Sequence, residues 1–273
     1  MLRTLFAEEI RTQVGRNAAT LGVCIVVLLG FLGLWWLLAD VDSLAALMQI
    51  AASLVLVAMP VVVLVQIAVE YWQSMYGQRG YLTQAVPVRG RVHVTAKLLY
   101  ACLMGLMSVA FALVGLVGWC GALAHSKGVG LSEILESVRT AADAAGPGLT
   151  TFLIVSVLIG FAAFIVEVAA VMSIGAQGRY SHAGFGAPLI GFVVLYVVNQ
   201  LLGLVSTLFL PLSIDVGTGD LTTRMMWPEF LESVGGDTDP AIVGAGSVIV
   251  SPLLAAVLVW WAVRAIERHM SLR

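Results

Sequence analysis

Long runs of apolar residues alternate with short polar segments along the whole chain. Crossing the hydrocarbon core of a bilayer takes about 20 predominantly apolar residues in a helix. Six runs meet this length, at residues 19–39, 44–72, 96–124, 149–176, 184–212 and 241–264. The pattern therefore predicts an all-α membrane protein with six transmembrane helices, in which residues 1–273 form a single transmembrane domain.

Aromatic residues lie at the ends of several of these runs. Trp and Tyr prefer the interface between membrane and water. The residues at the run ends are Trp35, Trp36, Tyr71, Trp72, Trp260 and Trp261. Their positions support the predicted boundaries. Pro60, inside the second run, predicts a kink that neighbouring helices can accommodate.

The composition excludes an ordinary soluble domain. Of the 273 residues, 60% are hydrophobic and only 11% are charged, whereas soluble domains have about a quarter of their residues charged. The net charge of −2 and the lack of a basic stripe give no reason to expect nucleic acid as a partner. We expect a multi-pass protein of the cell (plasma) membrane in contact with lipid.

The distribution of cations predicts the orientation, because cytoplasmic loops carry an excess of Lys and Arg. Of the 14 Lys and Arg residues, all but Lys127, Arg139 and Arg224 fall on one side of the six spans. These are Arg3, Arg11, Arg16, Arg79, Arg89, Arg91, Lys97, Arg179, Arg264, Arg268 and Arg273. That side is expected to be the cytoplasm, with both termini in it.

The segments outside the spans have distinct patterns. Residues 1–17 have apolar residues at helical spacing and predict an amphipathic helix in the cytoplasmic interface, or else a solvated extension of the first span. A short helix is expected at 131–143, followed by the breaker Gly146-Pro147-Gly148. Segment 213–240 is acidic and extracellular, with an apolar middle that we expect to dip into the outer leaflet or cap the bundle.

The longest cytoplasmic segment, residues 74–91, interleaves aromatic residues with cations and glycines. Aromatic and arginine side chains suit docking to a protein partner. The alternative is a basic loop that serves only orientation and contact with lipid headgroups.

This segment resembles the corresponding part of the ABC-2 type permease subunits, the membrane halves of ATP-driven exporters in many Gram-positive bacteria. The resemblance rests on Ser74, Met75, Tyr76, Gly77, Gly80, Tyr81, Leu82, then Val86, Pro87, Val88, then Lys97, Leu98, Leu99. A weaker echo is Ser173-Ile174-Gly175-Ala176-Gln177. Glu167 departs from the family pattern and leaves the substrate open.

The resemblance implies that residues 74–91 carry a coupling helix that contacts a separate ABC ATP-binding subunit. The implied contact residues are Ser74, Tyr76, Gly77, Arg79, Gly80, Tyr81, Leu82, Pro87 and Arg89. It also implies a second permease subunit, as a homo- or heterodimer, and export of an amphipathic or hydrophobic substrate.

The chain lacks the residues needed for ATP chemistry of its own. Its lysines, Lys97 and Lys127, do not lie in a GxxxxGK[ST] loop, which is what holds nucleotide phosphates. We therefore expect no enzymatic activity and no cofactor in this chain, with ATP and Mg bound by the partner subunit. The four histidines lie in loops or at span ends, so no metal site is expected.

Among the polar residues inside the predicted spans, Glu167 lies near the middle of span four, and Asn199 and Gln200 lie in the middle of span five. Ionisable groups in a membrane interior are costly and often mark transport paths, so these residues are candidates for a translocation path. The alternative is hydrogen bonding between helices, which we favour for Gln66 in the second span. A secondary transporter and a non-transporting scaffold or sensor subunit remain open as alternative functions.

Overall fold

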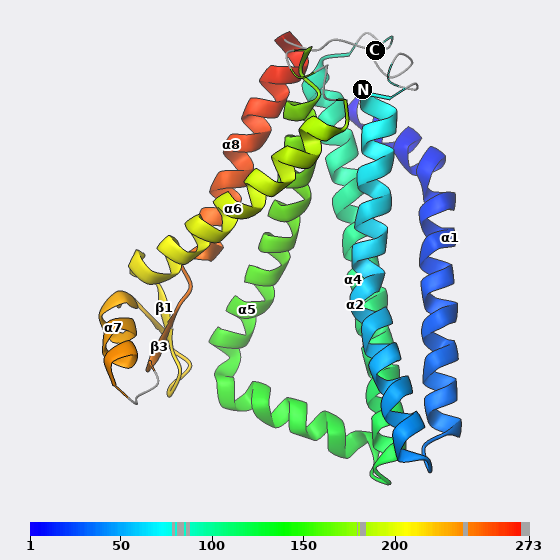
Figure 1. Cartoon of the computed structure of the whole chain (residues 1–273), viewed down its shortest axis with the longest axis vertical. Helices are drawn as coiled ribbons and strands as arrows, with labels where there is room; N and C mark the ends of the chain where they lie inside the picture. Colours follow the sequence, from blue (N-terminus) through cyan, green and yellow to red (C-terminus); the bar gives the residue numbers. More distant parts are fainter. Residues whose placement is uncertain are drawn as a thin grey trace. The chain divides into compact units, whose positions relative to one another are not determined.

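The computed structural model describes residues 1–77, 80, 85, 88–178, 180, 184–236 and 240–268, without the side chains of residues 141 and 268. The chain divides into two compact units, Met1–Thr140 and Ala141–Arg273, and each is described by itself below. Figure 1 shows the elements of both.

Six helices in the described part of the chain are long and apolar enough to cross a membrane. They are α1 (Leu2–Leu37), α2 (Asp42–Met75), α4 (Gly90–Ser126), the Ala142–Gly175 part of α5 (Leu131–Gly175), α6 (Gly186–Phe209) and the Ser247–Glu267 part of α8 (Ser247–Arg268). This confirms the prediction of six helices with the length and apolar composition needed to span a membrane.

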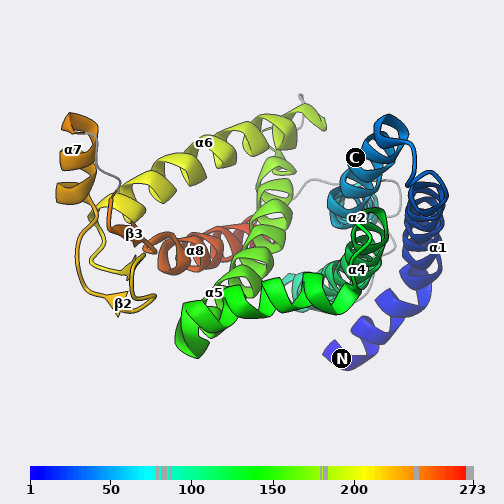
Figure 2. The same cartoon turned by 90° about the horizontal axis from the view of Figure 1, so that it is seen from below.

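The first unit is built on a bundle of α1, α2 and α4, which pack side by side (Figures 1 and 2). Close packing depends on small residues at the contacts. A β-carbon at Gly115 of α4 would lie 2.6 Å from a methyl group of Leu28 in α1 and 2.8 Å from one of Leu56 in α2. Glycine therefore lets all three helices meet at this level.

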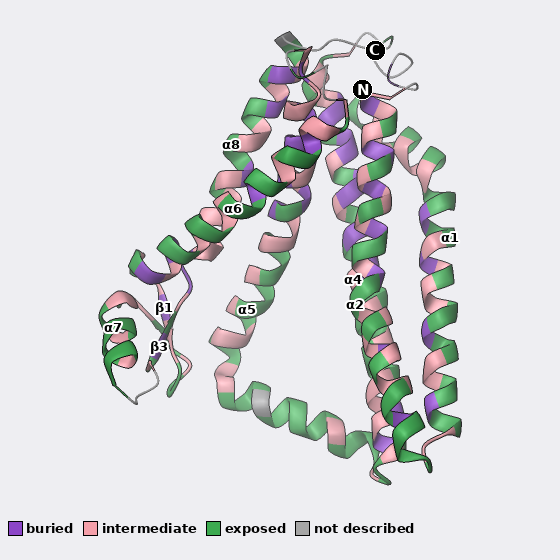
Figure 3. Ribbon diagram, in the orientation of Figure 1, coloured by how far each residue is buried: buried purple, intermediate pink, exposed green. Residues whose placement is uncertain are grey.

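Near the α1–α2 turn, the core of this bundle is aromatic. Trp35 is buried with Ala45 and Ala122, and its ring meets Trp119 edge to face at 5.6 Å. The indole N–H of Trp119 donates a hydrogen bond to Ser53 Oγ at 3.0 Å. Figure 3 shows buried and exposed residues alternating along these helices. Many of the exposed residues are large and apolar, as expected for a lipid-facing surface.

Helix α1 runs without a break through the predicted interfacial segment 1–17 and the predicted span 19–39. Its first turns lie at an angle to the rest of the helix (Figures 1 and 2). The predicted short helix at 131–143 is confirmed as the first part of α5. The predicted breaker is confirmed too, because Gly146 has φ 77° and interrupts the helical backbone.

In the second unit, a three-stranded antiparallel sheet follows α6, which the all-α prediction did not include. Strand β1 (Ser213–Asp215) lies between β2 (Leu221–Thr222) and β3 (Ile242–Gly244), and the short helix α7 (Trp227–Gly235) joins β2 to β3. Asp215 Oδ1 accepts hydrogen bonds from the backbone N–H groups of Gly217 and Thr218 and so shapes the β1–β2 turn.

The sheet is held against the end of α6 by backbone contact. A β-carbon at Gly244 would overlap the carbonyl oxygen of Thr207, and one at Gly246 would overlap that of Ser206. The ring of Trp227 in α7 stacks on Phe209 at 5.0 Å. The described residues of segment 213–240 therefore form a folded element packed on α6 rather than a free loop.

Candidate functional site

The implied contact residues of the 74–91 segment fall partly within the described chain. Ser74, Tyr76, Gly77, Gly80 and Arg89 are described, whereas the predictions for Arg79, Tyr81, Leu82 and Pro87 lie outside the described residues. The structure therefore defines the two ends of the segment.

The first end is formed where α2 stops. The backbone N–H groups of Tyr76 and Gly77 both donate to the Trp72 carbonyl, at 2.9 and 3.1 Å. The Tyr76 ring lies 5.3 Å from that of Trp72 and 6.2 Å from that of Tyr71. A β-carbon at Gly77 would lie only 3.0 Å from the Gln73 carbonyl oxygen, so a larger residue here would have to displace the last turn of α2 slightly.

The second end is formed where α4 begins. Arg89 is exposed and precedes the first turn of α4, where its carbonyl accepts a hydrogen bond from the Val92 N–H at 2.9 Å. Gly80, between the two ends, is buried, and its N–H donates to the Gly77 carbonyl at 2.8 Å.

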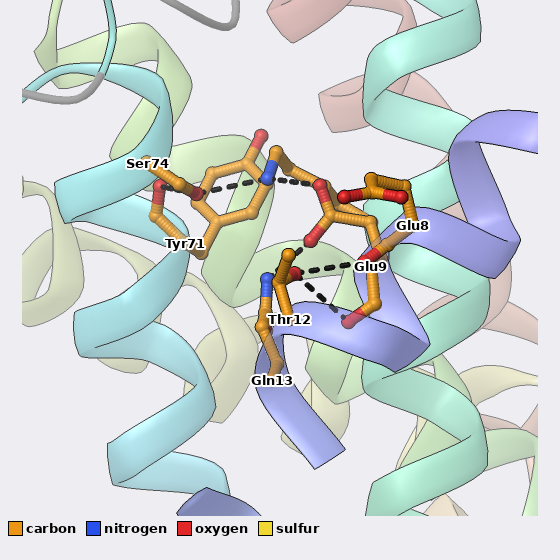
Figure 4. A network of polar contacts seen from close by, with 7 residues as sticks. Glu8, Glu9, Thr12, Gln13, Tyr71 and Ser74 are labelled. Atoms are coloured by element: carbon orange, nitrogen blue, oxygen red, sulfur yellow. Dashed lines mark hydrogen bonds and ion pairs between the residues drawn. The ribbon is translucent and has the colours of Figure 1, made fainter. Parts of the chain in front are cut away.

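Lys97 of α4 connects these two ends. Its Nζ lies 2.9 Å from Ser74 Oγ in the last turn of α2 and 2.5 Å from Glu9 Oε1 in α1. The Lys97 side chain is only 5% exposed. Figure 4 shows Glu9 and Gln13 of α1 facing Tyr71 and Ser74 of α2 around this contact. A buried ammonium is tolerated when charge and hydrogen-bond partners surround it.

The contact with Lys97 belongs to a longer polar face of α1. We define the α1 polar face as Glu9, Gln13, Arg16, Asn17 and Thr20, which recur at the helical spacing of one face. Gln13 Nε2 donates to Glu9 Oε2 within this face.

The other members of the α1 polar face bind α2 and α4. Arg16 Nε lies 3.3 Å from Glu70 Oε1, Asn17 Nδ2 donates to Tyr100 Oη at 2.7 Å, and the Thr20 hydroxyl donates to Gln66 Oε1. The expectation that Gln66 bonds between helices is therefore confirmed. The rest of this network is not predicted from the sequence, although the helical spacing of its α1 residues is a visible signal.

Removing the hydroxyl of Tyr100 is expected to loosen this bundle. Asn17 is fully buried, so Tyr100→Phe leaves its N–H₂ group without this acceptor. Polar contacts between membrane helices contribute about 0.6 kcal/mol on average, and an unsatisfied buried donor costs about 1–3 kcal/mol. We expect a loss near 1 kcal/mol, or a drop in Tm of about 2–4 °C.

Thermal unfolding of the detergent-solubilised chain measures this change. Tyr196→Phe is the matched control, because Tyr196 of α6 is 64% exposed. We expect this variant to have the same Tm as the wild type. Equal Tm values for the two variants would contradict a stabilising role of the Asn17–Tyr100 bond.

The second unit brings together two of the three predicted path residues. Glu167 of α5 is 1% exposed, and its Oε2 accepts a hydrogen bond from Asn199 Nδ2 of α6 at 2.7 Å. Its Oε1 is buried without a hydrogen-bond partner among the described residues. Gln200 is exposed and does not join them.

An apolar cavity of about 490 Å³ lies between α5, α6 and α8. Val171 and Val198 are among its lining residues; the first is one helical turn from Glu167 and the second is next to Asn199. The arrangement offers a large apolar surface close in sequence to one buried polar pair, which is the chemistry that an amphipathic molecule requires. Within the described residues, no group of three His, Cys, Asp or Glu side chains could hold a metal ion.

Comparisons of this chain with protein-family models, with curated proteins and with solved structures gave no match.

Proposed function

We propose that the chain is the permease subunit of an ABC-2 type exporter, with both termini in the cytoplasm and residues 1–17 at the cytoplasmic interface. The observation that carries this proposal is the motif of the 74–91 segment, from Ser74-Met75-Tyr76-Gly77 through Gly80-Tyr81-Leu82 to Val86-Pro87-Val88. It occurs between two of six membrane-spanning helices, on the side that carries most of the cations.

In this proposal, the 74–91 segment contacts an ATP-binding subunit that binds ATP and Mg and supplies the energy. Two permease subunits, identical or different, enclose the path. Support comes from the ends of the segment, which are held in place by the Ser74–Lys97 contact and the packed aromatic rings of Tyr71, Trp72 and Tyr76. Because these contacts hold the base of the segment, a displacement of the segment would also displace α2 and α4.

We assign Glu167 and Asn199 to the transport path, and we propose an amphipathic or hydrophobic substrate. The buried Glu167–Asn199 pair and the apolar cavity among the same helices support this assignment. Gln200 remains a prediction without support from the contacts of this unit.

A second candidate function is an ion-coupled secondary transporter. The observation that favours it is the set of ionisable side chains, Glu70, Lys97 and Glu167, buried in membrane-spanning helices. Such groups often form ion or proton paths in carriers. A scaffold or sensor subunit would bind a partner without turnover.

Co-purification with the product of an adjacent ATPase gene tests the proposal. We expect a stable complex whose ATPase activity falls when Tyr81→Ala or Arg79→Glu is introduced into the permease, because both substitutions alter the contact implied for the 74–91 segment. Tyr196→Ala, at an exposed position on α6, is the control and should leave the activity unchanged. Transport by the chain alone, without ATP, would instead favour the secondary transporter.

A further inference from the structure

Lys97 joins three helices whose contacting residues are far apart in the sequence. Through Ser74 it holds the last turn of α2, through its own backbone it belongs to the start of α4, and through Glu9 it holds the N-terminal turns of α1. The 74–91 segment is thus closed at its base by one side chain, and the same side chain ties that base to α1.

The partners of Lys97 are themselves held in position. Glu9 Oε2 accepts a hydrogen bond from Gln13, so the carboxylate is fixed while its other oxygen binds the ammonium. The Ser74 hydroxyl lies 3.3 Å from the Tyr71 carbonyl and donates to it, which leaves a lone pair of Oγ for the Lys97 N–H. Displacement of Ser74 therefore acts on Glu9 through Lys97.

Gly15 separates this contact from the next ones along α1. Glu9 and Gln13 lie on its N-terminal side, while Arg16 and Asn17, on its C-terminal side, bind Glu70 of α2 and Tyr100 of α4. A β-carbon at Gly15 would have open space around it, so packing does not explain the glycine. Glycine is the most deformable residue in a helix interior, and the first turns of α1 lie at an angle to the rest (Figure 1).

We propose that Lys97 is a positioning residue that couples the last turn of α2, at the base of the 74–91 segment, to the N-terminal turns of α1, which bend at Gly15 when this turn of α2 moves. The identity of the protein that moves the segment rests on the proposed function. The coupling itself concerns contacts within this chain, so it can be tested without that other protein.

The test is a distance measurement between two spin labels on the full chain in lipid nanodiscs. Labels are placed at Thr4→Cys in α1 and Gln73→Cys in the last turn of α2, both exposed positions, after Cys24, Cys102 and Cys120 have been replaced by alanine. We expect a single narrow distance peak for the chain with Lys97. Lys97→Met, which keeps the length of the side chain but removes its charge and donors, should lose that peak and give a broad distribution.

Two further variants keep the result interpretable. The exchange Glu9→Lys with Lys97→Glu restores an ion pair across the same contact, and we expect it to recover the narrow peak. Lys127→Met, at an exposed lysine of the same unit, is the matched control and should behave as the wild type. A narrow peak in Lys97→Met, or a broad one in the exchanged pair when that variant is folded, would overturn the proposal.

The bend at Gly15 has its own measurement. Gly15→Ala stiffens the helix, so with Lys97→Met it should give a narrower distribution than Lys97→Met alone. An unchanged distribution would exclude Gly15 as the point of bending. Failure of the ATPase subunit to bind would leave these distances unaffected, so it would contradict the proposed function and not the coupling.

Discussion

Gly244→Ala is expected to lower the Tm of the chain by about 5–10 °C and to open segment 213–244 to trypsin. The new β-carbon would overlap the Thr207 carbonyl oxygen and lie 2.8 Å from its carbon. These are backbone atoms that cannot rotate away, so β3 must separate from α6. Overpacking costs about 1–3 kcal/mol and sometimes more, and each kcal/mol shifts Tm by about 2–4 °C at this size.

Tryptic cleavage after Arg224 reports the local opening, because Arg224 lies in this segment and its guanidinium is paired with Glu229 in the folded state. Gly235→Ala is the control in the same segment, since a β-carbon there would have open space and alanine favours the helical end of α7. If Gly244→Ala and the control have the same Tm and the same rate of cleavage after Arg224, β3 does not pack closely on the backbone of α6.

Glu167→Ala is expected to abolish most transport-coupled ATPase activity of the complex while changing stability little. The hydrogen bond between Glu167 and Asn199 joins two membrane helices, and such bonds contribute about 0.6 kcal/mol on average and at most about 1.7. A loss of this size leaves the protein folded. A tenfold loss of turnover corresponds to only about 1.4 kcal/mol of transition-state stabilisation, so an energetic change too small to unfold the protein is readily seen in turnover when Glu167 takes part in transport.

The conservative variant separates the two roles. Glu167→Gln retains an acceptor for Asn199 and should keep the wild-type Tm, but it removes the carboxylate. Loss of activity in both variants identifies the carboxylate as the functional group. Loss of activity in Glu167→Ala alone shows that the hydrogen bond to Asn199 is what activity requires. If neither variant changes transport or coupled ATPase activity, Glu167 belongs to a structural seam and its assignment to the path is wrong.

The helices could be predicted from the sequence because hydropathy over 20 residues is a strong signal. Their observed bounds differ at the ends: α2 continues to Met75 and α4 begins at Gly90, where polar residues interrupt the apolar pattern but the backbone stays helical. The sheet could not be predicted, since strands of two or three residues are too short to show alternation. Its order depends on the Asp215 turn and on contact with α6.

The candidate site was predicted in part for a similar reason. Glu167 and Asn199 stood out as polar residues in apolar runs, and the structure pairs them. The α1 polar face was missed because its residues lie in the mixed N-terminal region, where charge was used for orientation. Lys97 was counted as a cytoplasmic cation, yet its 5% exposure reflects tertiary contacts with Glu9 and Ser74, which come from distant parts of the chain.

The described helices differ in how far their lengths exceed the thickness of a bilayer. At 1.5 Å per residue, the 36, 34 and 37 residues of α1, α2 and α4 measure about 50–55 Å. The 24 and 22 residues of α6 and α8 measure only about 33–36 Å. A bilayer is about 40–45 Å thick with its headgroups and about 30 Å without them.

Helices α6 and α8 are therefore only slightly longer than the hydrocarbon core is thick. Helices α1, α2 and α4 are each about 10 Å longer than the whole bilayer with its headgroups. On the proposed topology, the helices of the first unit therefore have length left over for contact with a partner in the cytoplasm. The α1 polar face lies in the N-terminal half of α1. On the proposed topology, the contacts around Lys97 therefore lie at the cytoplasmic end of these helices.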